Sequence, residues 1–447
     1  MFQLPINGSA MSLGAGRSVE KMAPDRVVVI NDFSSMGGGA TTVALDSMRL
    51  LNARKVSVTL LAGDNGRCDL PPDIEIVALG GNHILTGNRL NAAIRGLHNH
   101  GAEQLVASWI AKRDTPGTVY HLHGWSKILS PSIFRALRPV APRLVISAHD
   151  FFLACPNGGY FNFQAGTPCS LRPLGIRCLA SSCDRRHYSH KVWRFLRQLW
   201  THALCDLGEI GAILVVHEGM IPHFEFAGIP RRKLVPVRNA AAPWHATRIR
   251  AECNRTFVFV GRLDQDKGVD LLAEAGRRAE VPLRMIGDGA LASSIASEFP
   301  EIELVGWKSD AEVANFLRDA RVLVMPSRCR ETFGIVAVRA LKSGLPVLVS
   351  KHAMIAEEVV GGDFGVSCDP HDIDALAAAL KQLSIDDARI EEMSCCAHAN
   401  SDKLAPSPQA WVEQLLFIYT RVLHQGRPFG RWQDAPHKRE ARTPSRH

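Results

Sequence analysis

Short apolar runs alternate with longer amphipathic stretches along most of this chain. The first run, at residues 26–30 (RVVVI), leads into a glycine-containing loop, an amphipathic stretch and a second apolar run at residues 55–63. An apolar strand, a helix and another apolar strand at this spacing predict a parallel βαβ unit. Similar apolar runs follow at residues 74–80, 117–124, 143–150 and 211–218, with helical stretches at 88–112 and 131–138. Because buried parallel strands have this continuous apolar character, residues 26–243 are predicted to form a doubly wound α/β domain.

The same alternation restarts after a polar stretch at residues 244–255, which we interpret as a linker. Strands are predicted at 256–260, 282–287, 302–307, 321–327 and 346–350, and helices at 310–320, 335–344 and 373–383. A second parallel sheet is therefore expected within residues 256–400. Since open α/β sheets bind ligands at the carboxyl ends of their strands, we expect the functional site at the carboxyl ends of both sheets.

The two ends of the chain differ from these domains. Residues 405–425 place apolar side chains at helical spacing, which predicts a helix with one buried face that packs back on the protein. Residues 426–447 are basic and rich in proline and contain little to bury, so this tail is predicted to be disordered. An N-terminal extension at residues 1–25 is predicted to be disordered as well.

Composition narrows the class of protein. A chain of 447 residues that is 46% hydrophobic and 21% charged fits a folded protein of two domains. The first 22 residues lack the features of a secretory signal, and eleven cysteines in such a chain favour reduced thiols, so we expect a cytoplasmic location. The net charge of +8 would favour anionic surfaces, but no nucleic-acid-binding motif accompanies it, and we expect no nucleic-acid partner.

Two cations follow the predicted strand at residues 256–260. Arg262 leaves the end of the strand, and Lys267 lies on the loop before a helix. Fixed positive charge beside the free backbone N–H groups of a helix start suits a diphosphate. The alternative is a pair of surface cations on an ordinary loop, and this pair of residues alone does not decide between the two.

Further loops at strand ends carry small residues and an acid. Each glycine could serve turn geometry alone, but several such loops meeting at one sheet edge favour a ligand site. An N-terminal glycine loop does not match the spaced three-glycine fingerprint of dinucleotide binders, yet it would let a ligand approach the backbone. The candidate residues on these loops are Gly38, Gly39, Gly287, Gly289, Gly306, Trp307, Glu331, Thr332, Phe333 and Gly334.

Histidines close two of the predicted strands. His149 ends the run at residues 143–150, where it could act as an acid, donate a hydrogen bond to a sugar hydroxyl, or have a structural role. His121 and His123 alternate on another strand and would face the same side, so they are a weaker candidate for a metal pair. Since no third ligand is evident near them, we predict no metal site there.

The stretch between the two sheets contains two other unusual patterns. Four cysteines lie close together in the sequence without a Cys-x-x-Cys pair, so a zinc site and scattered buried thiols both stay open. We predict less than one equivalent of zinc. Residues 190–204 mix basic residues with tryptophans, which fits either a helix lying on an anionic membrane or a packed helix with a basic face in water. The four cysteines are Cys155, Cys169, Cys178 and Cys183.

Several of these motifs, in this order, resemble the retaining glycosyltransferases of family four. They are MGGGATT, SAHD, FVGRLDQDKGVD, IGDG, VGW and PSRCRETFGIVAVRALKSGLPVLVS, and the resemblance spans residues 26–425. The stretch AHDFFLACPNGGYFN, with the cysteines after it, further resembles capsule and exopolysaccharide members. The resemblance implies the GT-B fold, in which two Rossmann-like doubly wound parallel-sheet domains face each other. The N-terminal domain would then serve the acceptor and the C-terminal domain would bind the nucleotide-sugar donor.

The resemblance also implies roles for single residues. In the family, the pair that matches Arg262 and Lys267 stabilises the diphosphate leaving group, and the acid that matches Glu331 contacts the donor sugar. The histidine that matches His149 contacts the donor sugar or helps to place the acceptor. The implied reaction moves a sugar from a nucleoside diphosphate sugar, with retention at the anomeric carbon, to a saccharide or lipid-linked saccharide. No cofactor is implied besides this donor substrate, and a peripheral position on the inner face of the plasma membrane is a further hypothesis.

One position departs from the family's motif. A second glutamate, which binds the ribose hydroxyls in the family, is replaced by Arg339, eight positions after Glu331. A carboxylate accepts hydrogen bonds from both hydroxyls, whereas a guanidinium only donates. Arg339 would therefore donate to the ribose or a phosphate, pair with Glu331, or mark a protein that binds without catalysis. We favour an active enzyme, with a non-catalytic nucleotide-sugar-binding or scaffold protein as the alternative and an epimerase of the same fold as a third.

Overall fold

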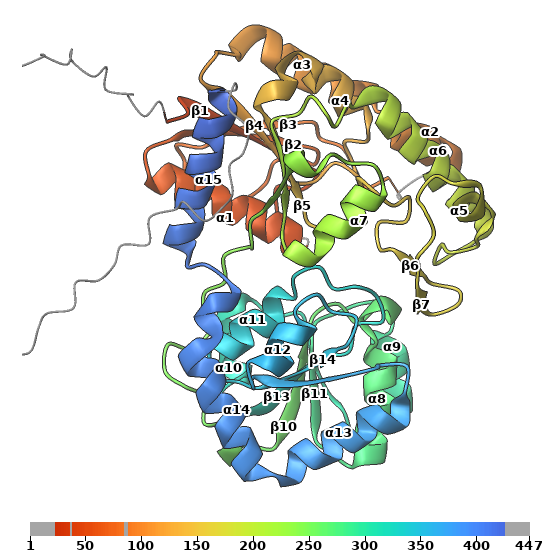
Figure 1. Cartoon of the computed structure of the whole chain (residues 1–447), viewed down its shortest axis with the longest axis vertical. Helices are drawn as coiled ribbons and strands as arrows, with labels where there is room; N and C mark the ends of the chain where they lie inside the picture. Colours follow the sequence, from red (N-terminus) through yellow and green to blue (C-terminus); the bar gives the residue numbers. More distant parts are fainter. Residues whose placement is uncertain (1–22, 36–37, 85–87, 425–447) are drawn as a thin grey trace, which may run out of the picture.

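Two α/β domains, one above the other in Figure 1, make up the part of the chain that the structure describes. This computed structural model describes residues 23–35, 38–84 and 88–424. Residues 1–22 of the predicted extension at residues 1–25 lie outside the described residues. The whole of the predicted tail at residues 426–447 lies outside them as well.

The N-terminal sheet has seven parallel strands in the order β3-β2-β1-β4-β5-β8-β9. Alternate side chains of β1 point to opposite faces, and both faces are buried. Val27 and Val29 pack beneath the helices α1 and α15, whereas Val28 and Ile30 pack with α3 and α4. The strands are β1 Arg26–Asn31, β2 Ser57–Ala62, β3 Glu75–Ala78, β4 Thr118–Leu122, β5 Leu144–Ala148, β8 Ala212–Val215 and β9 Leu234–Pro236. The helices of this part are α1 Gly39–Ala53, α2 Arg89–Leu97, α3 His100–Arg113, α4 Ser132–Leu137, α6 Tyr188–Leu204 and α7 Ile221–Phe226.

The single helix predicted at residues 88–112 is wrong, because the chain forms two helices there. α2 ends at Leu97 and α3 begins at His100. Asn99 between them has an extended backbone, and its side-chain oxygen accepts a hydrogen bond from the N–H of Ala102 at 3.2 Å. This N-cap stabilises a new helix start and explains the break.

The C-terminal sheet has six parallel strands in the order β12-β11-β10-β13-β14-β15. The loops after the neighbouring strands β10 and β13 therefore lie side by side at one edge. The strands are β10 Thr256–Val260, β11 Leu283–Ile286, β12 Glu303–Gly306, β13 Ala320–Met325, β14 Val347–Ser350 and β15 Gly365–Cys368. The helices are α8 Val269–Ala279, α9 Ala292–Glu298, α10 Asp310–Phe316, α11 Ile335–Lys342, α12 Ala356–Gly361, α13 Ile373–Ile385 and α14 Asp387–Asn400.

A segment of little regular structure reaches from the N-terminal domain toward the C-terminal one (Figure 1). It contains the hairpin of β6 Phe161–Asn162 and β7 Thr167–Pro168 and the short helix α5 Ile176–Ala180. A side chain added at Gly166 would meet the ring of His371 at 3.2 Å, so the hairpin touches the other domain. We call residues 155–191 the cysteine segment, because it carries the four clustered cysteines.

The last helix returns the chain to the N-terminal domain. α15, at Pro408–Leu423, packs beside α1 and the sheet, and its apolar face joins their core. The hydroxyl of Tyr419 lies 2.7 Å from Nδ1 of the buried His121 on β4. The chain therefore crosses between the domains twice, once at the linker and once before α15.

Replacing Leu415 by alanine is expected to lower the free energy of unfolding by about 2–5 kcal/mol, because it leaves a cavity between α15 and the sheet. Leu415 is 1% exposed, whereas Phe417 on the same helix is 61% exposed. Phe417→Ala is therefore the matched control, with an expected change within about 0.5 kcal/mol. Urea denaturation followed by fluorescence measures both, and equal losses would contradict the packing of α15.

Candidate functional site

An ion pair joins the loops that follow β10 and β13. Nζ of Lys267, in a short 3-10 turn at Gln265–Lys267, lies 2.6 Å from Oε2 of Glu331. The hydroxyl of Ser327 lies 3.2 Å from the same oxygen. Burial disfavours both charges, but each partner outweighs burial for the other, so the pKa of Lys267 is raised and the pKa of Glu331 is lowered. Both groups therefore stay ionised at neutral pH.

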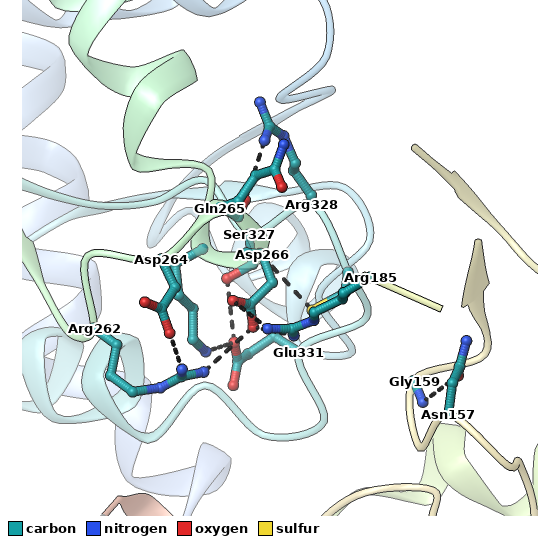
Figure 2. A network of polar contacts seen from close by, with 12 residues as sticks. Asn157, Gly159, Arg185, Arg262, Asp264, Gln265, Asp266, Ser327, Arg328 and Glu331 are labelled. Atoms are coloured by element: carbon teal, nitrogen blue, oxygen red, sulfur yellow. Dashed lines mark hydrogen bonds and ion pairs between the residues drawn. The ribbon is translucent and has the colours of Figure 1, made fainter. Parts of the chain in front are cut away.

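Arg262 and Arg185 both contact the acid that precedes Lys267. Arg262 pairs with Asp264 and lies 3.4 Å from Asp266, with 55% of its side chain exposed. Asp266 is only 5% exposed, and Arg185 of the cysteine segment contacts both of its oxygens, at 2.7 and 3.1 Å. Figure 2 shows this network, in which Arg185 comes from the other domain. Asp266 therefore has Arg185 as its nearest cationic partner, while Arg262 pairs more closely with Asp264.

Sequence reasoning missed Arg185 and Asp266. Asp266 stands between the two predicted cations, in the stretch GRLDQDKG. An acid at that position is itself a signal, because it would need a cationic partner. Arg185 lies in a stretch with neither apolar periodicity nor a glycine loop, so no local signal marks it.

The glycines of the C-terminal loops have packing roles in this fold. A Cβ atom at Gly287 would lie 1.9 Å from the carbonyl oxygen of Gly261, and one at Gly289 would lie 2.6 Å from backbone atoms of Leu263. These positions exclude side chains because two loops cross there. Gly306 has a φ of +76° with open space around it, and the adjacent Trp307 is mostly exposed. Trp307 therefore presents a flat apolar surface at the sheet edge.

The loop after Glu331 links the two domains. The hydroxyl of Thr332 donates to the carbonyl oxygen of His149 at 2.7 Å. Phe333 is a buried core residue, so only its backbone could face a ligand. Gly334 has a φ of +67° and stands at the N-terminus of α11, where the first N–H groups of that helix have no intrahelical acceptor. The carboxyl ends of β5 and β13 are thus held together.

His149 is the last member of a row of three histidines. Its Nε2 lies 3.0 Å from Nδ1 of His123, and Nε2 of His123 lies 3.2 Å from Nδ1 of His121. Burial lowers the pKa of His149 to about 4, so its ring is neutral at pH 7. Each ring nitrogen of His121 and His123 already has a hydrogen-bond partner, Ser147 and Tyr419 included, so the structure gives a metal pair no support.

A pocket of about 90 Å³ lies at the carboxyl ends of β1, β4 and β5. His149, Asp32 and Thr41 are among the residues that line it. Gly38 and Gly39 stand nearby at the start of α1, both exposed, and a side chain at either would meet none of the described residues within 4 Å. Within the described part of the chain, nothing therefore covers these two glycines.

Arg339 does not pair with Glu331. Of the three outcomes predicted for Arg339, the pairing with Glu331 is therefore wrong. Its guanidinium binds both oxygens of Asp310, at 2.5 and 2.8 Å, and lies 4.4 Å from the ring centre of Trp244. Its Nε donates to the carbonyl oxygen of Ala242 at 2.9 Å. Arg339 thus holds α11 to α10 and to the linker, and Glu331 remains with Lys267. Asp310 as its partner was not predicted, because no sequence pattern joins two residues 29 positions apart.

The predicted basic water-facing side of residues 190–204 is also wrong. Lys191 and Arg197 are buried, and the indole N–H of Trp193 donates to the carbonyl oxygen of Ala93 on α2 at 3.1 Å. The exposed side of α6 carries apolar residues instead, with Trp200 among them.

Residues 244–398 match the family described as "Glycosyl transferases group 1". Relatives include an uncharacterised glycosyltransferase of Methanocaldococcus jannaschii, 34% identical over 28% of this chain and 37% of that protein. A GDP-mannose-dependent alpha-mannosyltransferase of Corynebacterium glutamicum is 28% identical over 66% of this chain and 71% of that protein. An uncharacterised protein from the cps region of Klebsiella pneumoniae is 31% identical over 31% of this chain and 42% of that protein. The chain spans little more than a third of the first curated relatives that it matches.

Solved structures of glycosyltransferases share the whole fold. The sucrose-phosphate synthase of Thermosynechococcus elongatus matches with a TM-score of 0.68 at 16% identity, over 90% of this chain and 100% of that one. Anabaena HepE, solved with UDP-glucose, matches with a TM-score of 0.59 at 13% identity, over 87% and 98%. The predicted GT-B fold is confirmed, and residues 244–398, in the C-terminal domain, are the part that matches the family model.

Arg339→Glu is expected to lower the free energy of unfolding by about 1–3 kcal/mol, because it sets two carboxylates against each other and removes the contact with the linker. Asp310→Arg in the same chain restores opposite charges. The double variant should then be more stable than the two single losses predict, by about 0.5–2 kcal/mol. Urea denaturation of the three variants measures this coupling, and strictly additive losses would contradict the pairing.

Proposed function

We propose that the protein is a retaining glycosyltransferase that moves a sugar from a nucleoside diphosphate sugar to a saccharide or lipid-linked saccharide. The observation that carries the proposal is the group of Arg262, Lys267 and Glu331 at the domain interface. These charges lie at the carboxyl ends of parallel strands, next to the start of α11, where a diphosphate would meet both cations and backbone N–H groups. HepE, which shares the fold, was solved with UDP-glucose.

Transfer of the sugar requires that the nucleoside diphosphate leaving group be stabilised. As the sugar–oxygen bond breaks, negative charge grows on the diphosphate, and fixed cations stabilise it without reorganisation. Lys267 and Arg262 would supply this charge, while Glu331, already ionised, would face the donor sugar. His149, neutral at pH 7, can donate a hydrogen bond to a sugar hydroxyl. Holding donor and acceptor between two domains supplies the orientation that a transfer reaction needs.

Lys267→Ala and Glu331→Gln are expected to lower the rate of nucleoside diphosphate release at least about 100-fold, because each removes a group that stabilises the transferring state. The measurement is a coupled assay with UDP-, GDP- and ADP-sugars and a saccharide acceptor. Ile385→Val, at the exposed end of α13, is a control that should retain activity. A wild-type protein that binds nucleotide but never releases product would favour the scaffold alternative.

Arg185 is proposed as a positioning residue for the same site. Without it, the buried carboxylate of Asp266 would draw Arg262 and Lys267 toward itself and weaken their hold on a diphosphate. Arg185→Ala is expected to raise the Kd for the nucleoside diphosphate about tenfold, close to 1.4 kcal/mol. Asp266→Asn in the same chain should recover most of that affinity, since it removes the unpaired charge.

Isothermal calorimetry measures these affinities, and the neighbouring Arg186→Ala is the matched control. If Arg185→Ala binds as the wild type does, Arg185 has no such role. If Asp266→Asn fails to restore binding, the loss has a different cause from the charge of Asp266.

A lipid-linked acceptor and a peripheral membrane position complete the proposal. The relative from the Klebsiella pneumoniae cps region supports a role in surface polysaccharide. Exposed apolar residues on two adjacent helices, α2 and α6, offer a surface that could enter a lipid headgroup layer. In the described part of the chain, no helix is long and apolar enough to cross a membrane. The exposed residues are Leu90, Ile94, Leu196, Leu199 and Trp200.

Replacing Leu196 and Trp200 by serine is expected to reduce binding to anionic liposomes about tenfold, through the loss of apolar area. Trp193→Phe, on the side that packs against α2, should leave binding unchanged. Liposome flotation measures both. Unchanged binding of the double variant would remove this surface from the account.

A further inference from the structure

Lys191, in the first turn of α6, has an unusual environment. It is 1% exposed, and its ammonium lies 3.2 Å from Sγ of Cys178. It also hydrogen-bonds Cys183. Among the residues that the structure describes, no carboxylate lies within ion-pair distance of it. A buried lysine side chain thus has two sulfur atoms as its partners.

A buried ammonium requires an anion nearby, because the loss of water otherwise favours the neutral amine. A protonated thiol is a weak acceptor and carries no charge. Burial lowers the pKa of Lys191, but the two sulfurs outweigh burial and hold it above its ordinary value. The contacts therefore describe a buried ammonium 3.2 Å from Sγ of Cys178, beside Cys183, whose own pKa burial raises. We call Cys178, Cys183 and Lys191 the lysine–dithiol site.

Cys155 of the same segment makes a different contact. Cys155 donates its S–H to the side-chain oxygen of Asn157 at 3.1 Å, which is a bond that only the protonated thiol makes. Burial raises the pKa of Cys155 to about 11. The amide nitrogen of Asn157 instead lies 3.3 Å from Sγ of Cys183, so that sulfur accepts. Asn157 thus accepts a hydrogen bond from the thiol of Cys155 and donates one to the sulfur of Cys183.

A shared metal ion explains this arrangement less well than redox chemistry does. In the part of the chain that the structure describes, the one set of donors that lie within 4.8 Å of one another is His98, His100 and Glu103. The sulfur atoms of the cysteine segment do not form such a set. A cysteine sulfur beside an ammonium, with a second cysteine five residues later, is instead a group that peroxides oxidise, since the thiolate is the nucleophile and a cation stabilises it.

We propose that Cys178 and Cys183 form a peroxide-sensitive dithiol whose reduced state is held by Lys191. The Cys178 thiolate attacks hydrogen peroxide: an S–O bond forms, the O–O bond breaks, and the released hydroxide takes a proton to leave as water. Cys183 then attacks the oxidised sulfur, an S–S bond forms and a second water leaves. Two thiols and one peroxide give one disulfide and two waters, so the step needs no further reactant.

Cys178 is the first target because it makes the 3.2 Å contact and stands on the short surface helix α5. Ile176, two residues before Cys178, is 88% exposed, whereas Cys178 is 6% exposed, so the sulfur lies beneath a helix at the surface of the protein. Cys183 follows five residues later, in a stretch with little regular structure that can bring the sulfurs together. The disulfide would remove both sulfur partners of Lys191.

The site also adjoins the donor site. Cys183 is followed by Asp184, which pairs with Arg194, and by Arg185, which holds Asp266. Oxidation would strain these contacts, so the oxidised protein is expected to bind a nucleoside diphosphate about tenfold more weakly. This last consequence rests on the proposed function, whereas the chemistry of the cysteines does not.

The test is peptide mass mapping of the full chain after exposure to a few equivalents of hydrogen peroxide, with iodoacetamide added to block free thiols. Trypsin cuts after Arg177 and Arg185, so Cys178 and Cys183 fall in one peptide, CLASSCDR. We expect this peptide to lose about 2 Da and resist alkylation, and dithiothreitol to reverse both changes. The peptide with Cys155 and Cys169 should stay alkylated at both positions, as an internal control.

Two variants separate the steps. In Cys183→Ser, the sulfenic acid on Cys178 has no partner, so dimedone should label Cys178. Lys191→Met should oxidise about tenfold more slowly than wild type, because the thiolate loses its cation, whereas Lys191→Arg should stay close to wild type. Circular dichroism checks that both lysine variants fold, and the Cys183→Ser result stands even if Lys191→Met does not.

Several results would overturn the proposal. They are alkylation of both cysteines after peroxide, a disulfide from Cys178 to Cys155 or Cys169, or a stoichiometric zinc ion in the purified protein that protects the thiols. If the Cys178–Cys183 disulfide forms but the affinity for nucleotide is unchanged, the peroxide-sensitive site stands and only its coupling to the donor site is excluded. A protein without nucleotide binding would leave the mapping result intact, so the two failures are distinguishable.

Discussion

The ion pair between Lys267 and Glu331 is the constraint on which the rest of the domain interface depends. Two mostly buried charges are stable there only because each neutralises the other, and their pairing fixes the loops after β10 and β13 in one arrangement. The nearby buried acid Asp266 also needs a cation, and its partner Arg185 belongs to the other domain, so this ion pair crosses the interface. Charge pairing thus relates the loops after β10 and β13 to the cysteine segment, in addition to the apolar core that the two domains share.

The same reasoning explains how this chain accommodates an arginine where its resemblance to family four predicts a second acid. Arg339 has a carboxylate partner, Asp310, an aromatic face, Trp244, and the carbonyl of Ala242 just before the linker. All three nitrogens of the guanidinium therefore have an acceptor in or next to the C-terminal domain. The acid of the motif that remains, Glu331, keeps its own cation. The substitution changes how the linker is held without taking Glu331 out of the interface.

Much of this architecture follows from sequence pattern. The apolar runs identify nearly all strands of both sheets, because parallel strands buried on both faces have few polar positions. The break between α2 and α3 was missed, since Asn99 resembles an ordinary polar residue on a helix until its capping contact is seen. Motif spacing led to Lys267 and Glu331, which the fold brings into contact. Arg185 and Asp310 could not be predicted, because their importance arises from partners far away in the sequence.

The most direct test of the account is a calorimetric titration of UDP, GDP and ADP into the wild-type protein and into Lys267→Met. The account predicts that one of the three binds the wild type with a Kd in the micromolar range, close to 8 kcal/mol, and that Lys267→Met weakens it at least about tenfold. Equal binding by the two proteins, or binding of none of the three nucleotides to a folded wild type, would contradict the claim that these charges form a nucleoside diphosphate site.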